Sequence, residues 1–257
     1  MRDRQIGTDV VYWIGRMFPQ ERTAMQVSTL IFDLYGTLAD IHTDETLPSL
    51  WRETAKDAGF DGAESYRAAY LRLCAEEVQI RAKTLPAVPE EWIEPELLYV
   101  FMRLHACGPQ RARQAAKRFR ERSTLRIGRM PHAIETLDAL RQANRRVYLL
   151  SNAQSCFTND ELVALGLSDR FDGILLSSDA GMKKPYRGLF DRLIETYGID
   201  RNTALMVGND AVADMGGAHG AGLRGAYIHT WQSGVRPKTL PPGCFEIRDL
   251  WELTDLL

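Results

Sequence analysis

The sequence lacks the features that mark secreted and membrane-spanning proteins. It has only four cysteines in 257 residues, and they are scattered without a Cys-x-x-Cys pair. This usage indicates reduced thiols rather than a disulfide framework or a zinc site. No apolar run approaches the roughly 18 residues that a membrane span needs, and residues 1–24 hold no uninterrupted apolar stretch of the signal-peptide kind. We therefore expect a cytoplasmic protein that has no membrane partner.

Net charge is also small. The formal charge is −2, which gives no bulk attraction for nucleic acid or a membrane surface. One basic run stands out, because eight Lys or Arg residues and a single Glu lie between Arg111 and Arg129. We interpret this run as a solvated helix face. Attraction for an anionic substrate or for nucleic acid remains an alternative, although no interleaved aromatic residues favour a nucleic-acid site.

The sequence does contain a regular alternation of strand and helix signals. Residues 28–34 predict a buried strand. Further strands are expected at 146–150, 173–176, 203–207 and 225–228, and residues 245–257 fit a last short strand and a helix. Helical spacing separates them at 131–143, 159–165, 186–197 and 211–221. This order predicts an α/β protein with a Rossmann-like, doubly wound parallel sheet.

A second, smaller domain is expected between the first and second strands. Apolar residues recur at helical spacing over 47–59, 63–82, 94–107 and 111–125, which indicates a small all-helical cap. The predicted domains are an N-terminal extension at 1–25, a core at 26–43 and 127–257, and the cap at 44–126. A short helix is possible at about 8–17 within the extension.

Polar side chains follow four of the predicted strands. In a parallel sheet the carboxyl ends of the strands meet at one edge, where ligands bind. Each residue by itself is a common turn or helix-capping residue. Together at one edge they indicate a catalytic or binding site. In chain order they are Asp33 with Thr37, Ser151 with Asn152, Lys183 with Lys184, and Asn209-Asp210 with Asp214.

The stretch Phe32-Asp33-Leu34-Tyr35-Gly36-Thr37-Leu38 resembles the first motif of the haloacid dehalogenase superfamily. The other three polar strand ends follow the order of the remaining motifs of that superfamily. Most members are phosphatases, so the resemblance implies hydrolysis of a small phosphomonoester through an aspartyl-phosphate intermediate on Asp33. It also implies a helical cap that closes over the site.

The resemblance further implies how the site residues divide their roles. Lys184 offsets the charge of nucleophile and substrate, with Lys183 as the competing choice. The substrate is bound by Thr37, Ser151, Asn152 and, in a dehalogenase, Arg52. The expected cofactor is Mg²⁺, which prefers oxygen ligands. Its predicted ligands are Asp33, the Tyr35 carbonyl and Asp210, with Asp214 orienting a metal-bound water or Lys184. Asn209 is the alternative to Asp210, which we prefer because it is charged.

Tyr35, which we place with Asp33 and Lys184 among the candidate catalytic residues, departs from the pattern of the phosphatases. They carry an aspartate there, which protonates the leaving group and later activates water, whereas tyrosine is a poor base at neutral pH. The 2-haloacid dehalogenases resemble this chain at that position, and they use the same aspartate without a metal. Their substrate-binding arginine resembles Arg52 in Leu50-Trp51-Arg52. Candidates to replace the missing acid are Asp40, His42, Asp44 and Glu45, and nothing in the sequence selects among them.

The favoured function is therefore a Mg²⁺-dependent phosphatase with a small anionic substrate. The acidic pair Asp210 and Asp214 favours it over a metal-free dehalogenase. A catalytically impaired binding protein of the same fold is the third reading. No nucleic-acid or membrane partner is expected, and the sequence leaves the oligomeric state open.

Overall fold

A six-stranded parallel sheet forms the centre of the molecule, which confirms the predicted fold class. The computed structural model describes residues 26–256, so the predicted N-terminal extension and its helix at about 8–17 lie outside the described residues. The strand order is β5-β4-β1-β6-β7-β8. The strands are β1 (Thr29–Phe32), β4 (Arg146–Ser151), β5 (Gly173–Leu176), β6 (Ala204–Gly208), β7 (Arg224–Ile228) and β8 (Cys244–Ile247).

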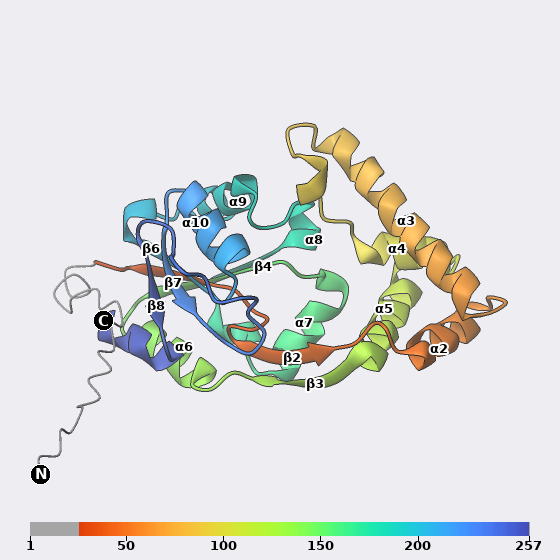
Figure 1. Cartoon of the computed structure of the whole chain (residues 1–257), viewed down its shortest axis with the longest axis horizontal. Helices are drawn as coiled ribbons and strands as arrows, with labels where there is room; N and C mark the ends of the chain where they lie inside the picture. Colours follow the sequence, from red (N-terminus) through yellow and green to blue (C-terminus); the bar gives the residue numbers. More distant parts are fainter. Residues whose placement is uncertain (1–25, 257) are drawn as a thin grey trace, which may run out of the picture.

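The central strand β1 is buried on both faces, which is why its sequence is continuously apolar. Leu30 and Phe32 belong to one hydrophobic cluster, and Ile31 belongs to the cluster on the opposite face. Figure 1 shows helices on both sides of the sheet. The first cluster includes residues of α6 (Ala133–Gln142), α7 (Ser155–Ala164) and the 3-10 helix η5 (Leu250–Leu256); the second includes residues of α8 (Ser177–Ala180), α9 (Arg187–Tyr197) and α10 (Gly217–Gly220).

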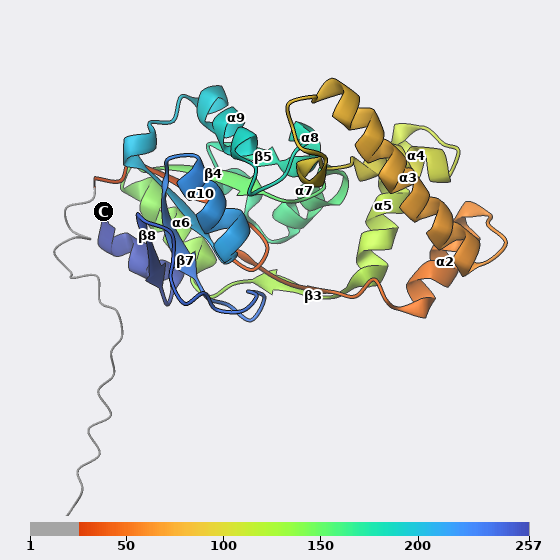
Figure 2. The ribbon, with the colours of Figure 1, turned by 45° about the horizontal axis from the view of Figure 1, so that its top comes forward.

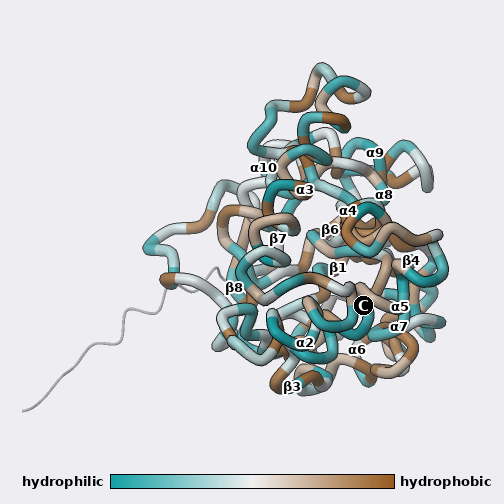
Figure 3. The backbone as a smooth tube through the Cα atoms, turned by 90° about the vertical axis from the view of Figure 1, so that its right-hand side faces the viewer, coloured by the Kyte–Doolittle hydropathy of each residue, from teal (hydrophilic) through white to brown (hydrophobic). Residues whose placement is uncertain are grey.

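Four helices between residues 48 and 123 stand beside the sheet domain (Figures 1 and 2). They are α2 (Pro48–Ala58), α3 (Ala63–Thr84), α4 (Leu97–Leu104) and α5 (Pro109–Ser123). Figure 3 shows hydrophobic and hydrophilic positions alternating along these helices. Their inner faces form a separate aromatic core in which Tyr70 stacks on Phe119 at 5.5 Å. This cluster also takes in Cys156 and Phe157 of α7, so the helical unit packs directly on the sheet domain.

Two antiparallel strands that the sequence did not predict connect the two parts. Strand β2 (Ala39–Thr43) pairs with β3 (Thr124–Arg129), and Figure 2 shows β3 running from beneath the sheet domain to α5. Leu125 and Ile127 alternate with polar residues or glycine in β3, but the run is short and every residue of β3 is exposed or half-buried. Its partner lies about 80 residues away in sequence, and this pairing is decided by the tertiary fold.

The helix predicted at 211–221 differs in detail from the structure. It begins as a π-helical turn over Ala211–Gly216 and continues as the short α10. Short 3-10 helices, η1 (Glu90–Trp92), η2 (Ser168–Arg170) and η3 (Arg201–Thr203), complete the described chain. All four cysteines are free thiols. Within residues 26–256, no helix combines the length and the apolar character that crossing a bilayer requires.

Candidate active site

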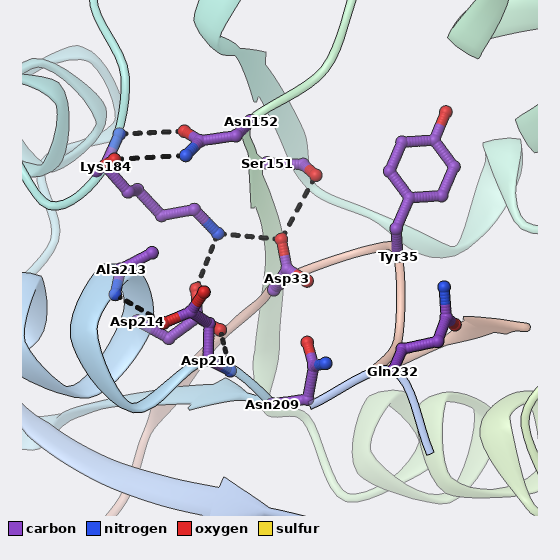
Figure 4. A pocket seen from close by; sticks show the side chains of 10 residues that line it. All are labelled: Asp33, Tyr35, Ser151, Asn152, Lys184, Asn209, Asp210, Ala213, Asp214 and Gln232. Carbon is purple, nitrogen blue, oxygen red and sulfur yellow. Dashed lines mark hydrogen bonds and ion pairs between the residues drawn. The ribbon is translucent and has the colours of Figure 1, made fainter. Parts of the chain in front are cut away.

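The polar strand ends meet in one small pocket of about 200 Å³ at the carboxyl edge of the sheet. Figure 4 shows side chains from the ends of β1, β4 and β6 facing one another across it, together with a lysine from the loop before α9. The lining residues are Asp33, Tyr35, Ser151, Asn152, Lys184, Asn209, Asp210, Ala213, Asp214 and Gln232. The structure therefore brings together most of the predicted site residues.

Asp33 directly follows β1 and is only 7% exposed. One carboxylate oxygen, Oδ1, accepts hydrogen bonds from Ser151 Oγ at 3.1 Å and from Lys184 Nζ at 2.7 Å. The other oxygen, Oδ2, has a long contact of 3.4 Å with Thr37 Oγ1. The carboxylate is thus held in a fixed orientation at the pocket wall, as a nucleophile requires.

Lys184 is fully enclosed, with a side chain 2% exposed. Its ammonium donates to Asp33 Oδ1 at 2.7 Å, Asp214 Oδ1 at 2.6 Å and the Leu150 carbonyl at 2.9 Å, which uses all three of its N–H groups. Asn152 fixes the backbone of the lysine through a pair of hydrogen bonds, Lys184 N to Oδ1 at 2.7 Å and Nδ2 to Lys184 O at 3.1 Å. Lys183 is half-buried and does not line the pocket, so the geometry selects Lys184.

The side chains at the carboxyl edge of the sheet carry more negative than positive charge. Burial lowers the pKa of Lys184, but the adjacent Asp214 and Asp33 outweigh this effect and raise it above its ordinary value. Burial raises the pKa of Asp214, and the contact with Lys184 offsets only part of that rise. One ammonium is therefore shared by two buried carboxylates, and Asp210 adds a third carboxylate to the pocket lining.

Gly36 forms the turn that places Asp33 and Thr37 on the same side. Its φ is +83°, and a Cβ at this position would lie 2.3 Å from Asn209 Nδ2. Thr37 Oγ1 donates to Asn209 Oδ1 at 3.2 Å, and Thr230 Oγ1 donates to the Gly36 carbonyl at 3.0 Å. The turn is therefore packed against the end of β6 and the loop after β7.

Gly36→Ala is expected to damage both stability and activity. The methyl group collides with the Asn209 amide and the backbone φ is unfavourable, so we expect a loss of more than about 1 kcal/mol of unfolding free energy. Urea denaturation measures this loss. Gly59→Ala is the matched control, because Gly59 has a φ of +71° but no atom within 4 Å of its hypothetical Cβ. Equal destabilisation in the two variants would contradict the steric argument.

Asn209 and Asp210 have different surroundings. Asn209 is 6% exposed and lies against Thr37 on the side of the Asp33 turn. Asp210 is exposed, and its Oδ1 accepts hydrogen bonds from Val212 N and Ala213 N, both at 2.8 Å. Figure 4 shows the carboxylate of Asp210 turned towards Ala213. The role of Asp210 as a metal ligand stays a prediction, and the geometry brings Asn209 equally into the pocket.

The Tyr35 hydroxyl points away from Asp33, as Figure 4 shows. It donates a short hydrogen bond to the Glu161 carboxylate on α7 and bonds to Thr158 Oγ1 at 2.9 Å. The Arg120 guanidinium of α5 lies over the Tyr35 ring at 5.2 Å and pairs with Glu161 at 2.6 Å. Burial, together with the charge of Glu161, raises the pKa of Tyr35 far above its ordinary value. A catalytic role for this side chain stays a prediction that the geometry does not support.

Glu161→Gln is expected to lower the unfolding free energy by about 3 kcal/mol, because it leaves the mostly buried Arg120 without its counter-charge. Chemical denaturation monitored by circular dichroism measures the change. Asp160→Asn is the matched control on the same helix, since Asp160 forms only an exposed pair with Lys117. If Asp160→Asn lowered the unfolding free energy as much as Glu161→Gln, the larger contribution that we assign to the buried pair of Arg120 and Glu161 would be contradicted.

The remaining sequence candidates do not line the pocket. Arg52 is on an exposed face of α2, so its predicted contact with a substrate carboxylate has no geometric support. Asp40 accepts hydrogen bonds from Arg126 and the Trp231 indole, and Asp44 binds Thr46. His42 and Glu45 are exposed. None of the four proposed replacements for the missing acid therefore reaches Asp33.

The basic run is largely paired with carboxylates. Ion pairs join it to acidic residues of α2, α7 and β2. The paired cations are Lys117, Arg118, Arg120, Arg122 and Arg126. Lys117, Arg118 and Arg126 are exposed, in agreement with our interpretation of the run as a solvated face, whereas Arg120 is mostly buried and departs from it.

Sequence reasoning missed three residues at or beside the site. Gln232 lines the pocket from the loop after β7 and donates to the Ile41 carbonyl. Gln232 lies four residues beyond the end of β7, so the strand-end rule that identified Asp33 indicates the loop after β7 but does not single out this residue. Arg120 and Glu161 had no comparable signal, because their contact with Tyr35 depends on how α5 packs against α7.

The donor set suits a hard cation. Within residues 26–256, no three His, Cys, Asp or Glu side chains gather as a protein-only metal cage. Mg²⁺ needs only one or two carboxylates, however, because it keeps several waters. Both carboxylate oxygens of Asp214 already accept hydrogen bonds, from Lys184 Nζ and from Asp210 N at 2.9 Å. Asp214 is therefore suited to positioning other residues of the site rather than to binding the cation directly. Asp33 Oδ2, with its single long contact, has capacity for a cation, as do the backbone carbonyl of Tyr35 and the side-chain oxygens of Asn209 and Asp210.

The chain is similar to several known proteins. A family model described as haloacid dehalogenase-like hydrolase matches residues 27–222. Pyrimidine 5'-nucleotidase YjjG of Escherichia coli is 32% identical over 129 residues, which cover 50% of this chain and 56% of that protein. The (S)-2-haloacid dehalogenase 4A of Burkholderia cepacia is 24% identical over 88% of this chain and 93% of its own.

The fold is shared with solved structures. That of 2-haloacid dehalogenase from Pseudomonas syringae pv. Tomato DC3000 has a TM-score of 0.63 at 21% identity, covering 90% of this chain and 97% of its own. The match to the curated phosphatases spans only about half of their length. Phosphatases and dehalogenases therefore both occur among the relatives, and the specific reaction has to be argued from the site.

Proposed function

The chain belongs to the haloacid dehalogenase-like family of hydrolases, and we propose that it hydrolyses a small phosphomonoester through attack of Asp33 on phosphorus. The observation that carries this proposal is the excess of negative charge at the pocket. Three carboxylates, on Asp33, Asp210 and Asp214, line it together with a single ammonium. Asp33 and Asp214 contact the same ammonium, and buried like charges disfavour joint ionisation unless a cation intervenes. The excess negative charge would attract the divalent cation that phosphoryl transfer uses. A metal-free dehalogenation has no use for this excess negative charge.

The side chains around Asp33 support this chemistry. An oxygen of Asp33 forms a bond to phosphorus while the ester bond breaks, and water later releases phosphate from the aspartyl intermediate. Ser151 Oγ and Lys184 Nζ donate to Asp33, so they hold the attacking carboxylate in place, and the ammonium offsets part of the negative charge at the reacting centre. Asn152 keeps Lys184 in place through its backbone.

Mg²⁺ is the cofactor we propose. Asp33, the Tyr35 carbonyl and either Asp210 or Asn209 would hold it, and Asp214 would act through Lys184 and the Asp210 amide. When bound, the ion supplies positive charge that stabilises the phosphoryl oxygens. The protein holds the side chains of Asp33 and Lys184 in a fixed relative position. It also provides the negative charge that the ion would neutralise.

A paired assay tests the function directly. Release of phosphate from an aryl phosphate is measured with and without Mg²⁺, beside release of halide from 2-chloropropionate. We expect phosphate release that depends on Mg²⁺ and no halide release. Halide release without phosphate release would replace the proposal by dehalogenation. The absence of both activities would favour the impaired binding protein.

Addition of Mg²⁺ is expected to raise the melting temperature of the metal-free protein. A ligand that binds only the folded state stabilises it by about 2.7 kcal/mol at a hundredfold excess over its dissociation constant. For a chain of this size that corresponds to several degrees. Thermal unfolding is followed at constant ionic strength, with KCl as the control salt. No rise at millimolar Mg²⁺ would contradict the metal assignment, and an equal rise in Asp210→Ala would exclude Asp210 as a ligand.

Metal-free dehalogenation through Asp33 is the second candidate. The dehalogenase relative supports it, because its alignment extends over 88% of this chain, and so does Tyr35, which resembles the dehalogenase motif. The exposed position of Arg52 weighs against it, since the lining has no arginine to bind a substrate carboxylate. The halide assay above decides between the two.

The proposed partner is a small anionic substrate in the cytoplasm. The size of the pocket supports a small substrate, and the proposed Mg²⁺ supports an anionic one. The pairing of the basic run with carboxylates supports the expectation that nucleic acid is not a partner.

A further inference from the structure

The described side chains that line the pocket include no proton donor placed for a leaving alkoxide. An alkoxide leaves a phosphate ester readily only when a neighbouring acid protonates it. Such an acid must have a proton available and must face the scissile bond. The lining residues fail one or the other condition, each for a reason that the hydrogen bonds make plain.

Lys184 and Asp214 already form hydrogen bonds with each other and with neighbouring groups. All three N–H groups of Lys184 have acceptors within 2.9 Å, on Asp33, Asp214 and Leu150. Asp214 is 1% exposed, and its two oxygens accept from Lys184 Nζ and from Asp210 N. With these hydrogen bonds made, neither group has a proton free to donate to a leaving oxygen.

The hydroxyls are also turned to other partners. Ser151 Oγ donates to Asp33. Tyr35 Oη donates to Glu161, with Thr158 as its other partner, and Figure 4 shows it directed away from Asp33. The mostly buried pair of Glu161 and Arg120 holds it there.

The other lining side chains are amides or acceptors. The carboxylate of Asp210 accepts two backbone N–H groups at the start of the following helical turn. Asn152 and Gln232 donate to the backbone carbonyls of Lys184 and Ile41, and an amide is no acid in any case. A substrate that reacts quickly at this site must release a group that is stable without a proton.

We infer that the substrate is a small acyl phosphate, which releases a carboxylate rather than an alkoxide. This inference rests on the proposed phosphatase function. A carboxylic acid is ionised at neutral pH, with a pKa of about 4, so its anion leaves unaided. The size of the pocket, about 200 Å³, suits one phosphoryl group on a short acyl chain. A nucleoside polyphosphate is larger.

The reaction balances without a general acid. An Asp33 oxygen bonds to phosphorus as the bond from phosphorus to the acyl oxygen breaks, and the acyl oxygen keeps the electron pair and leaves as carboxylate. A water oxygen then bonds to phosphorus while the bond to Asp33 breaks. One water proton stays on the phosphate and the other passes to solvent, so the products are carboxylate, hydrogen phosphate and a proton.

The dependence of rate on the leaving group tests the inference. We would measure kcat/KM of the full chain with Mg²⁺ for acetyl phosphate, p-nitrophenyl phosphate, phenyl phosphate and glycerol 3-phosphate, subtracting the rate of Asp33→Asn. General acid catalysis contributes about 10²–10⁴-fold. We therefore expect acetyl and p-nitrophenyl phosphate to exceed phenyl and glycerol phosphate by at least about 100-fold. In Tyr35→Phe the ratios should be unchanged, whatever happens to the absolute rates.

The outcomes separate the two proposals. Similar kcat/KM values for acetyl phosphate and glycerol 3-phosphate would overturn the inference and leave the phosphatase function standing. A change of about tenfold or more in the ratios in Tyr35→Phe would identify the hydroxyl as the acid and would also overturn it. No phosphate release from any of the four substrates above the Asp33→Asn rate would overturn the phosphatase function and the inference together.

Discussion

Asp33→Asn is expected to abolish turnover, with a loss of kcat of roughly 10⁴-fold or more, comparable to the loss of a catalytic nucleophile in other hydrolases. An amide cannot attack phosphorus to give the aspartyl intermediate, although it fills the same space. Ser151 and Lys184 would still contact the asparagine, so the fold should survive. Initial rates with an aryl or acyl phosphate measure the loss, and mass spectrometry of the quenched wild-type enzyme should show the phosphorylated aspartate.

Asp200→Asn is the matched control for this experiment. Asp200 is a carboxylate at the amino end of β6, where it accepts from Asn202 N, and so it lies at the edge of the sheet opposite the pocket. The Asp200→Asn variant should retain activity. Near-normal activity in Asp33→Asn would refute covalent catalysis by Asp33 and with it the proposed reaction.

Lys184→Met is expected to impair both folding and catalysis. Methionine fills similar space but leaves Asp33 and Asp214 as two buried carboxylates without a counter-charge. Removal of one partner from a buried ion pair costs about 3–5 kcal/mol, and loss of a donor to the reacting centre costs about 10²–10³-fold in kcat. Denaturant unfolding and steady-state kinetics measure the two effects separately.

The stability loss in Lys184→Met should also depend on pH. Burial already raises the pKa of Asp214 above its value in the unfolded chain, and Lys184 is the group that opposes this rise. Without the lysine the folded protein binds a proton more tightly than the unfolded chain does. Stability of the variant is then present at acidic pH and lost as pH rises through the folded pKa. The deficit relative to wild type should therefore shrink on acidification.

Lys183→Met provides the matched control one residue away. Lys183 is half-buried and its backbone N–H donates to the Trp92 carbonyl, outside the pocket. We expect almost unchanged activity in this variant. Equal losses in the two variants would contradict the selection of Lys184. Combining Lys184→Met with Asp214→Asn should recover part of the lost stability, because it removes one of the two unpaired carboxylates.

The sequence by itself determined the central sheet and the composition of most of the pocket. Buried parallel strands are local, continuously apolar runs, so β1 and its neighbours can be read without knowledge of their partners. The crossover rule then brings the ends of these strands to one edge. Asp33, Ser151 and Asn209 could be placed together on that basis alone, since each directly follows or closes a strand.

Tertiary structure decided what no local pattern encodes. Lys183 and Lys184 are neighbours of the same type, and only burial between Asp33 and Asp214 distinguishes them. Tyr35 lies two residues after Asp33, yet packing of α5 on α7 turns its hydroxyl to Glu161 and away from Asp33. The β2–β3 pair and the exposed position of Arg52 likewise depend on contacts between distant segments. The sequence pattern of a strand predicts which residue lies at the edge of the sheet. The direction in which its side chain then points depends on contacts with residues from distant parts of the chain.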